Sequence, residues 1–183
     1  MLRVLAVGQW LPRKGIDTLV LAWGRIVQPD AQLELIGETG ADPAYEALVR
    51  SAISATAQAI DVRGTVTDRD LARAYATADL FALPSRYEGY GMVYAEALLY
   101  GLPVIACDTG PVPDLVGPDA GLLVPPGDPV ALAAALDRLL TDDGLRERMS
   151  KAASRRGREL PTWDDTTAGF QDALVAAIEM RGR

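Results

Sequence analysis

The stretch DLFALPSRYEGYGMVYAEALLYGLPVIAC, from Asp79 to Cys107, decides the fold. Its apolar run at 79–83 predicts a buried strand, and residues 92–100 contain no helix breaker. Gly101 is typical of a helix end, and the apolar run at 102–107 predicts a second strand. A strand, helix and strand of this length predict a right-handed parallel crossover. The loop between the first strand and the helix therefore lies at the carboxyl edge of a sheet, where open α/β folds bind ligands.

The rest of the chain alternates between apolar runs and amphipathic segments. Further strands are expected at 3–8, 32–37, 61–64 and 121–124. Helical patterns of apolar residues occur at 16–27, 43–53, 68–75, 129–139, 142–158 and 163–178, and a short helix is expected after 113. This alternation predicts the α/β class, with a doubly wound, mostly parallel Rossmann-like sheet of about six strands covered on both faces.

Several helix boundaries carry their own signals. Asp42, Thr67 or Asp68, and Asp128 are expected to cap the helices that follow them. The first helix is expected to include Val27 and to end at Pro29, and the second is expected to carry Leu48 on its apolar face. Thr162 is expected to cap the last helix, which has an apolar stripe of Trp163, Phe170, Leu174, Ala177 and Ile178.

The composition excludes several classes of function. A length of 183 residues suits one domain or one half of a two-domain protein. The net charge of −7 argues against broad nucleic-acid binding, and the absence of histidine excludes His-based triads, metal sites and general bases. Cys107, the single cysteine, lies in an apolar run and is interpreted as a core residue in a reducing cytoplasm. No apolar run reaches membrane-spanning length, and no signal peptide is recognised.

The glycines in the loop after residue 83 indicate an anion site. Gly89 and Gly91 allow a tight turn and a close approach of the backbone to a ligand. The amides of Tyr90, Gly91 and Met92 would then point out of a helix start, which favours a phosphate or diphosphate. On the glycines alone, a plain strand-to-helix turn is the favoured alternative.

Charged residues near this loop strengthen the hypothesis. Glu88 precedes the helix, and Glu96 lies about one and a half turns inside it, within reach of a ribose beside the phosphates. Lys14, in a glycine-bearing loop after the first strand, offers an ammonium suited to phosphates, with Arg13 beside it. Taken singly, each glutamate fits a solvated surface position better than a site, and for Lys14 the two interpretations are even.

Together these motifs resemble the signature of family 4 glycosyltransferases. The resemblance covers nearly the whole chain, and the combination is more specific than any one motif. It is carried by EGYGMVYAE at 88–96, GLPVIA at 101–106, VG at 7–8, KGIDTL at 14–19, AD at 78–79, LPS at 83–85 and GLLVPPGD at 121–128.

The resemblance implies a GT-B fold, of which this chain is the C-terminal, donor-binding half. Residues 1–160 would form the Rossmann-like nucleotide-sugar-binding domain, and 161–183 a crossover helix that packs toward an N-terminal domain or a partner. The implied reaction is retaining transfer from a nucleoside-diphosphate sugar, with no cofactor and no required metal. The acceptor, whether glycan, lipid or small molecule, is left open. Without its N-terminal half, the chain is expected to be inactive or nearly so, and either to self-associate through the apolar stripe of the last helix or to have a donor-cleft face with unusual apolar exposure.

Carried over to this sequence, the family pattern implies roles for particular residues. Glu88 and Lys14 would be catalytic: Glu88 would bind the donor sugar, and Lys14 with the amides of 90–92 would stabilise the diphosphate as it leaves. Glu96 would bind the ribose, and Val66 in the loop 64–68 would contact the base. Gly8, Gln9 and Arg13 complete the donor-binding set; Gln9 stands where many members carry arginine, and Arg13 is the residue that would compensate.

Two alternatives remain open. The chain could be a stand-alone nucleotide-sugar binding module without transferase activity. It could also be a GT-B relative of different chemistry, such as an epimerase, which the lack of histidine disfavours. The expected location is the cytoplasm, with peripheral membrane contact only through the missing half.

Overall fold

The strands form one open parallel sheet, as expected. The computed structural model describes residues 1–27, 30–161 and 163–181. Within them, a six-stranded sheet has the order β3-β2-β1-β4-β5-β6, and every neighbouring pair is parallel. The strands are β1 (Leu2–Val7), β2 (Ala31–Ile36), β3 (Ala59–Gly64), β4 (Leu80–Leu83), β5 (Val104–Cys107) and β6 (Gly121–Val124).

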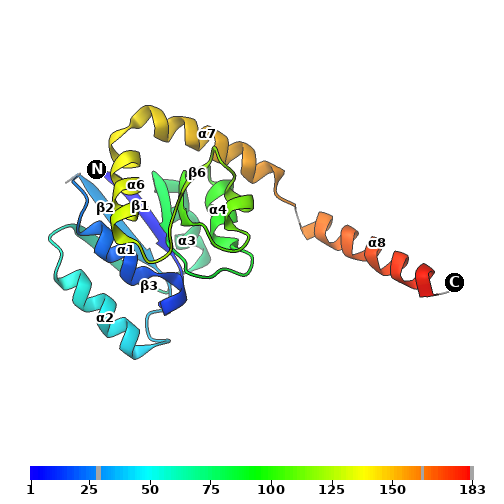
Figure 1. The fold of residues 1–183 in the computed structure, drawn as a ribbon, viewed down its shortest axis with the longest axis horizontal. Helices are drawn as coiled ribbons and strands as arrows, with labels where there is room; N and C mark the ends of the chain where they lie inside the picture. Colours follow the sequence, from blue (N-terminus) through cyan, green and yellow to red (C-terminus); the bar gives the residue numbers. More distant parts are fainter. Residues whose placement is uncertain (28–29, 162, 182–183) are drawn as a thin grey trace.

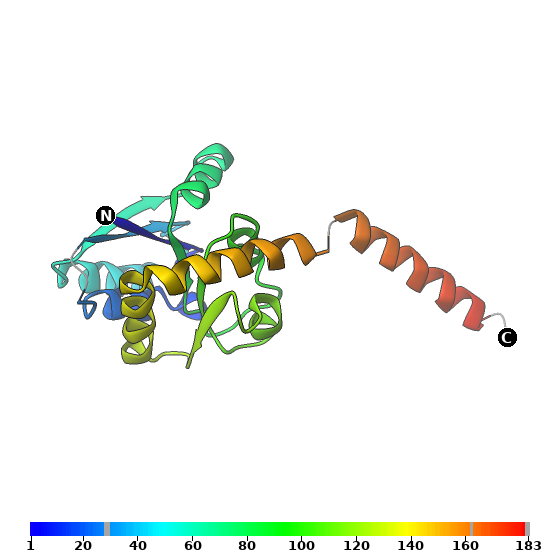
Figure 2. The same cartoon turned by 90° about the horizontal axis from the view of Figure 1, so that it is seen from above.

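Helices cover both faces of this sheet, which makes it doubly wound (Figures 1 and 2). α1 and α2 follow β1 and β2, and α6 returns to pack beside α1. α3 and α4 lie on the opposite face, where both contact Phe81 of β4. The helices are α1 (Ile16–Trp23), α2 (Pro43–Ser54), α3 (Asp68–Thr77), α4 (Met92–Leu99), α5 (Val112–Val116), α6 (Pro129–Thr141), α7 (Asp143–Glu159) and α8 (Trp163–Arg181), with a short 3-10 helix, η1 (Pro12–Lys14), before α1.

Side chains cap three of these helices where the sequence predicts it. Asp42, Thr67 and Asp128 each accept a hydrogen bond from a backbone N–H in the first turn of the helix that follows. Such a bond satisfies a donor that has no partner inside the helix. The predicted starts of α2, α3 and α6 are therefore confirmed.

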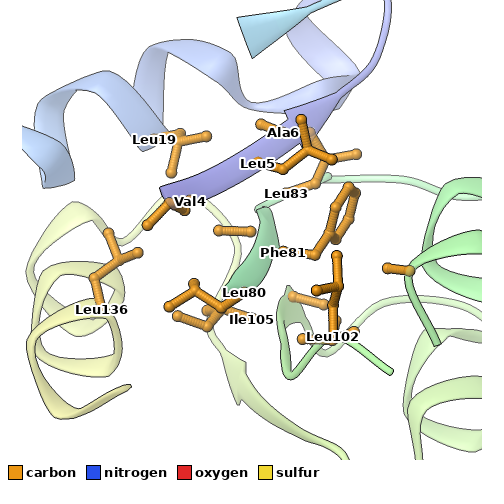
Figure 3. Close-up of a cluster of buried hydrophobic side chains, with 14 of the residues drawn as sticks. Val4, Leu5, Ala6, Leu19, Leu80, Phe81, Leu83, Leu102, Ile105 and Leu136 are labelled. Atoms are coloured by element: carbon orange, nitrogen blue, oxygen red, sulfur yellow. The ribbon is translucent and has the colours of Figure 1, made fainter. Parts of the chain in front are cut away.

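The core lies where the central strands meet the helices. β4 and β5 are buried along their whole length. Figure 3 shows Leu19 of α1 and Leu136 of α6 on one side of these strands and Phe81 on the other. Cys107 is fully buried, and burial raises the pKa of its thiol to about 11, so the interpretation of Cys107 as a core residue is confirmed.

Two sequence-based details are wrong. α1 ends at Trp23, not near residue 28, and Val27 lies beyond it and is 81% exposed. The reason is that Gly24 follows and that Trp23 is anchored to the sheet, where its indole N–H donates to the Ala59 carbonyl. Leu48 is 54% exposed, because α2 buries only a narrow strip around Val49. Pro29 lies outside the described residues.

α8 projects away from the sheet and its other helices (Figures 1 and 2). Phe170, Leu174 and Ile178 of the predicted stripe are exposed on it. Thr162 and the side chains of Trp163 and Ala177 lie outside the described part of the chain. Throughout the described ranges, no helix combines the length and apolar character needed to cross a membrane.

Candidate functional site

The strand order reverses between β1 and β4 at the centre of the sheet. From β1 the chain proceeds outward to β2 and β3, and from β4 it proceeds the other way to β5 and β6. The loops that leave the carboxyl ends of β1 and β4 therefore separate over opposite faces of the sheet. In open α/β sheets such a switch point is the usual place for a ligand.

Lys14 and Glu88 meet at this switch point although they are 74 residues apart. Lys14 Nζ lies 2.5 Å from Glu88 Oε1, and the two side chains are 10% and 6% exposed. Ser85 Oγ, also buried, donates to the same oxygen at 2.8 Å. Since the described residues leave no fully buried side-chain oxygen without a partner, the second oxygen of Glu88, which receives no hydrogen bond from them, is not completely sealed from solvent.

The backbone holds the two loops against each other. The N–H of Arg86 donates to the carbonyl of Arg13 at 2.7 Å. Gly15 has φ +68°, and a Cβ there would lie 2.2 Å from the Pro84 carbonyl oxygen. Only glycine permits both the left-handed conformation and this approach. Lys14 is therefore positioned by a loop that cannot carry a larger residue next to it.

A chain of polar side chains supports this contact. Arg86 Nη2 lies 2.6 Å from Asp17 Oδ2, and the Tyr45 hydroxyl donates to Asp17 Oδ1 at 2.6 Å. Burial and the neighbouring Asp17 carboxylate raise the pKa of Tyr45 above its ordinary value, so its hydroxyl remains a donor. This support includes residues from α1, α2 and the β4–α4 loop, and sequence reasoning missed it because each residue alone resembles a surface residue.

Gly8, at the end of β1, lies beside Lys14, and Gln9 follows it in the chain. The backbone of Gly37 approaches so closely that a Cβ on Gly37 would lie 2.0 Å from the Gly8 carbonyl oxygen. A Cβ on Gly8 would lie 3.7 Å from the Lys14 side chain. Gln9 Nε2 donates to Glu38 Oε2 at 2.6 Å, so the side chain in the place of the family's arginine is engaged with a carboxylate.

The glycine loop is only partly as predicted. Gly91 is buried with φ +89°, and a Cβ on it would lie 3.0 Å from Leu115. Gly89 does not have positive φ and faces open space, so the turn does not require it. The backbone amides of Tyr90, Gly91 and Met92 donate no hydrogen bond to any described residue. Tyr90 and Met92 are themselves exposed. Unpaired amides at the start of α4 suit an anion.

Glu96 is held by a residue that the sequence did not single out for this role. The Tyr75 hydroxyl, from α3, donates to Glu96 Oε2 at 2.8 Å. Glu96 is half-buried, one turn beyond the first turn of α4. A buried tyrosine on the apolar stripe of a helix predicts a core residue, and only its hydroxyl, which needs a partner when buried, could have signalled more.

The remaining predicted residues lie farther out. Arg13 is exposed, and its guanidinium forms no ion pair or hydrogen bond with another described residue. Val66 follows β3, which is an edge strand two positions from β1, and it is half-buried against the core. Among the described residues, no group of three or more Cys, Asp or Glu side chains is placed to hold a metal ion.

Comparison with known proteins identifies the family. Residues 2–142 match the family described as glycosyl transferases group 1. The chain belongs to this family. The sequence-based resemblance to family 4 glycosyltransferases is thereby confirmed.

Individual relatives agree with this assignment. GDP-mannose-dependent monoacylated alpha-(1-6)-phosphatidylinositol monomannoside mannosyltransferase of Corynebacterium glutamicum is 36% identical over 154 residues, which cover 79% of this chain and 39% of that protein. D-inositol 3-phosphate glycosyltransferase of Jonesia denitrificans is 38% identical over 186 residues, 95% of this chain and 44% of the relative. This glycosyltransferase chain thus spans about two fifths of the length of these curated relatives.

A solved structure confirms the fold. Sucrose-phosphate synthase from Thermosynechococcus elongatus superposes with a TM-score of 0.82 at 34% identity, over 96% of this chain and 46% of that one. The sheet of this glycosyltransferase chain is therefore one Rossmann-like half of a GT-B fold.

Proposed function

We propose that this chain is the donor-binding half of a glycosyltransferase that takes a sugar from a nucleoside-diphosphate sugar with retained configuration. The observation that carries the proposal is the meeting of Lys14 with Glu88 at the switch point, beside the unpaired amides that begin α4. The relative whose name calls it GDP-mannose-dependent supports a nucleotide-sugar donor. The acceptor would bind between this half and an N-terminal half or partner.

In the proposed mechanism, a cation and backbone N–H groups bind the diphosphate, and two carboxylates bind the sugar and the ribose. As the bond from the sugar to the diphosphate breaks, negative charge accumulates on the leaving diphosphate. Lys14 and the amides of residues 90–92 stabilise that charge. The second oxygen of Glu88 accepts a hydrogen bond from a sugar hydroxyl, and Glu96 accepts from the ribose. No metal ion enters this proposal.

Isothermal titration calorimetry of the 183-residue chain with GDP, UDP, ADP and their sugars tests the proposal. At least one of these ligands is expected to bind with a Kd of about 1 μM to 1 mM. Lys14→Met should weaken that binding, whereas Lys151→Met, which removes an exposed lysine on α7, should leave it unchanged. If the folded protein binds none of these ligands at millimolar concentration, the proposal fails.

A further inference from the structure

The buried side chain of Tyr75 contacts Glu96, the residue proposed to bind the ribose. Tyr75 is 2% exposed, and its hydroxyl lies 2.8 Å from Glu96 Oε2 and 3.3 Å from the Val93 carbonyl oxygen. A phenol has one proton to donate. The carboxylate is both the nearer and the stronger acceptor, so the proton is directed at Glu96.

The aromatic ring of Tyr75 cannot easily turn away from this position. It stacks on Tyr100 with the ring centroids 5.4 Å apart, and on Phe81 with the centroids 6.0 Å apart. Burial, with Glu96 beside it, also raises the pKa of Tyr75 above its ordinary value. At neutral pH the hydroxyl is therefore protonated and fixed in place.

The two oxygens of Glu96 have different surroundings as a result. Oε2 accepts from Tyr75, whereas Oε1 receives no hydrogen bond from a described residue. Because the described part of the chain has no fully buried side-chain oxygen without a partner, Oε1 of the half-buried Glu96 retains contact with solvent. The carboxylate is thus held by one oxygen and presents the other.

We propose that Tyr75 is a positioning residue that fixes the Glu96 carboxylate for the ribose of the nucleotide; this inference rests on the proposed function. A carboxylate whose plane is already set should bind two neighbouring ribose hydroxyls more tightly, because a freely rotating glutamate loses side-chain entropy when it binds. Tyr75 also lies on α3, the helix that follows the loop expected to flank the base. One helix would then connect the base and the ribose parts of the site.

The test compares a ribonucleotide with its counterpart that lacks both ribose hydroxyls. Calorimetry measures the Kd of the best-binding nucleoside diphosphate and of its 2′,3′-dideoxy form. The wild-type chain should prefer the ribonucleotide by about tenfold or more, the worth of hydrogen bonds to a charged group. Tyr75→Phe retains the ring and removes the hydroxyl, and should reduce this preference by about threefold or more. Glu96→Gln should reduce it further.

Tyr100→Phe is the matched control, since it removes a hydroxyl from the same aromatic stack without touching Glu96. It should keep the wild-type preference. The ratio of the two Kd values does not depend on the folded fraction, because both ligands are measured on the same sample, so a partly unfolded variant remains informative.

The outcomes separate this inference from the proposed function. If no nucleotide binds the wild-type chain, the proposed function itself is wrong. If nucleotides bind without a ribose preference, or if Tyr75→Phe retains the full preference that Glu96→Gln loses, the role of Tyr75 is overturned while nucleotide binding stands. A loss of preference in Tyr75→Phe but not in Tyr100→Phe supports it.

Discussion

Glu88 and Glu96 belong to the same loop and helix, yet the fold holds them in different ways. Glu88 is buried and paired with a cation, Lys14, whereas Glu96 is half-buried and held by a neutral phenol from Tyr75. The charge of Glu88 is therefore largely neutralised, and that of Glu96 is not. A diphosphate that approaches Lys14 must compete with Glu88, while a ribose that approaches Glu96 finds an open oxygen.

The largest expected effect comes from removing the cation of the buried pair. Lys14→Met leaves Glu88 as a buried carboxylate without its partner, which typically costs about 3–5 kcal/mol in the free energy of unfolding. Urea denaturation, monitored by circular dichroism, measures this change in the free energy of unfolding.

The chain provides a matched control in its only other lysine. Lys151 pairs with Glu147 at 2.6 Å, almost the same distance, but the two side chains are 75% and 68% exposed. Lys151→Met should leave the unfolding free energy nearly unchanged, because exposed pairs contribute little. Equal effects of the two variants would contradict the contrast between buried and exposed pairing.

The second prediction compares the nucleotide binding of two variants, in which Glu88 or Glu96 is replaced by the neutral glutamine. Glu88→Gln removes the charge that competes for Lys14, so free nucleoside diphosphate should bind about three- to tenfold more tightly. Glu96→Gln should weaken the same ligand by about tenfold, because a charged acceptor of ribose hydroxyls is lost. Calorimetry with free nucleotide measures both.

The sequence-based role of Glu88, as a ligand of the donor sugar alone, would instead predict no change in the binding of free nucleotide. The ion pair with Lys14 is the reason for this difference, because it couples the glutamate that we propose to bind the sugar to the lysine that we propose to bind the diphosphate. Unchanged binding in Glu88→Gln would mean that Lys14 does not contact the diphosphate.

The smallest expected effect concerns a third carboxylate at the same edge of the sheet. Glu38 is exposed and accepts a hydrogen bond from Gln9. Glu38→Gln removes a negative charge near the candidate diphosphate site, and should tighten nucleotide binding by about twofold at low salt and less at physiological salt, because salt screens exposed charges. Glu147→Gln, on α7, is the control and should have no effect.

Most of the fold could be predicted from the sequence because its signals are local. Asp128 followed by proline begins α6, and the apolar run at 121–124 coincides with β6. The sequence-based placement of Val27 in α1 and of Leu48 on the buried face of α2 is wrong, because a helical period alone shows neither where a helix ends nor how wide its buried face is. The contact of Trp23 with the sheet depends on residues distant in sequence, and so does the choice of which α2 residues are buried.

In the candidate site, too, some features could be predicted from the sequence and others could not. The sequence by itself determined the residue types: a lysine after the first strand, two glutamates around a glycine turn, and a glycine at 91 that the turn requires. Only the tertiary structure decided the partners. Lys14 meets Glu88, and Tyr75 meets Glu96, because the strand order places β1 beside β4 and the chain lays α3 and α4 on one face. Such contacts depend on how whole elements pack, and no local pattern encodes that.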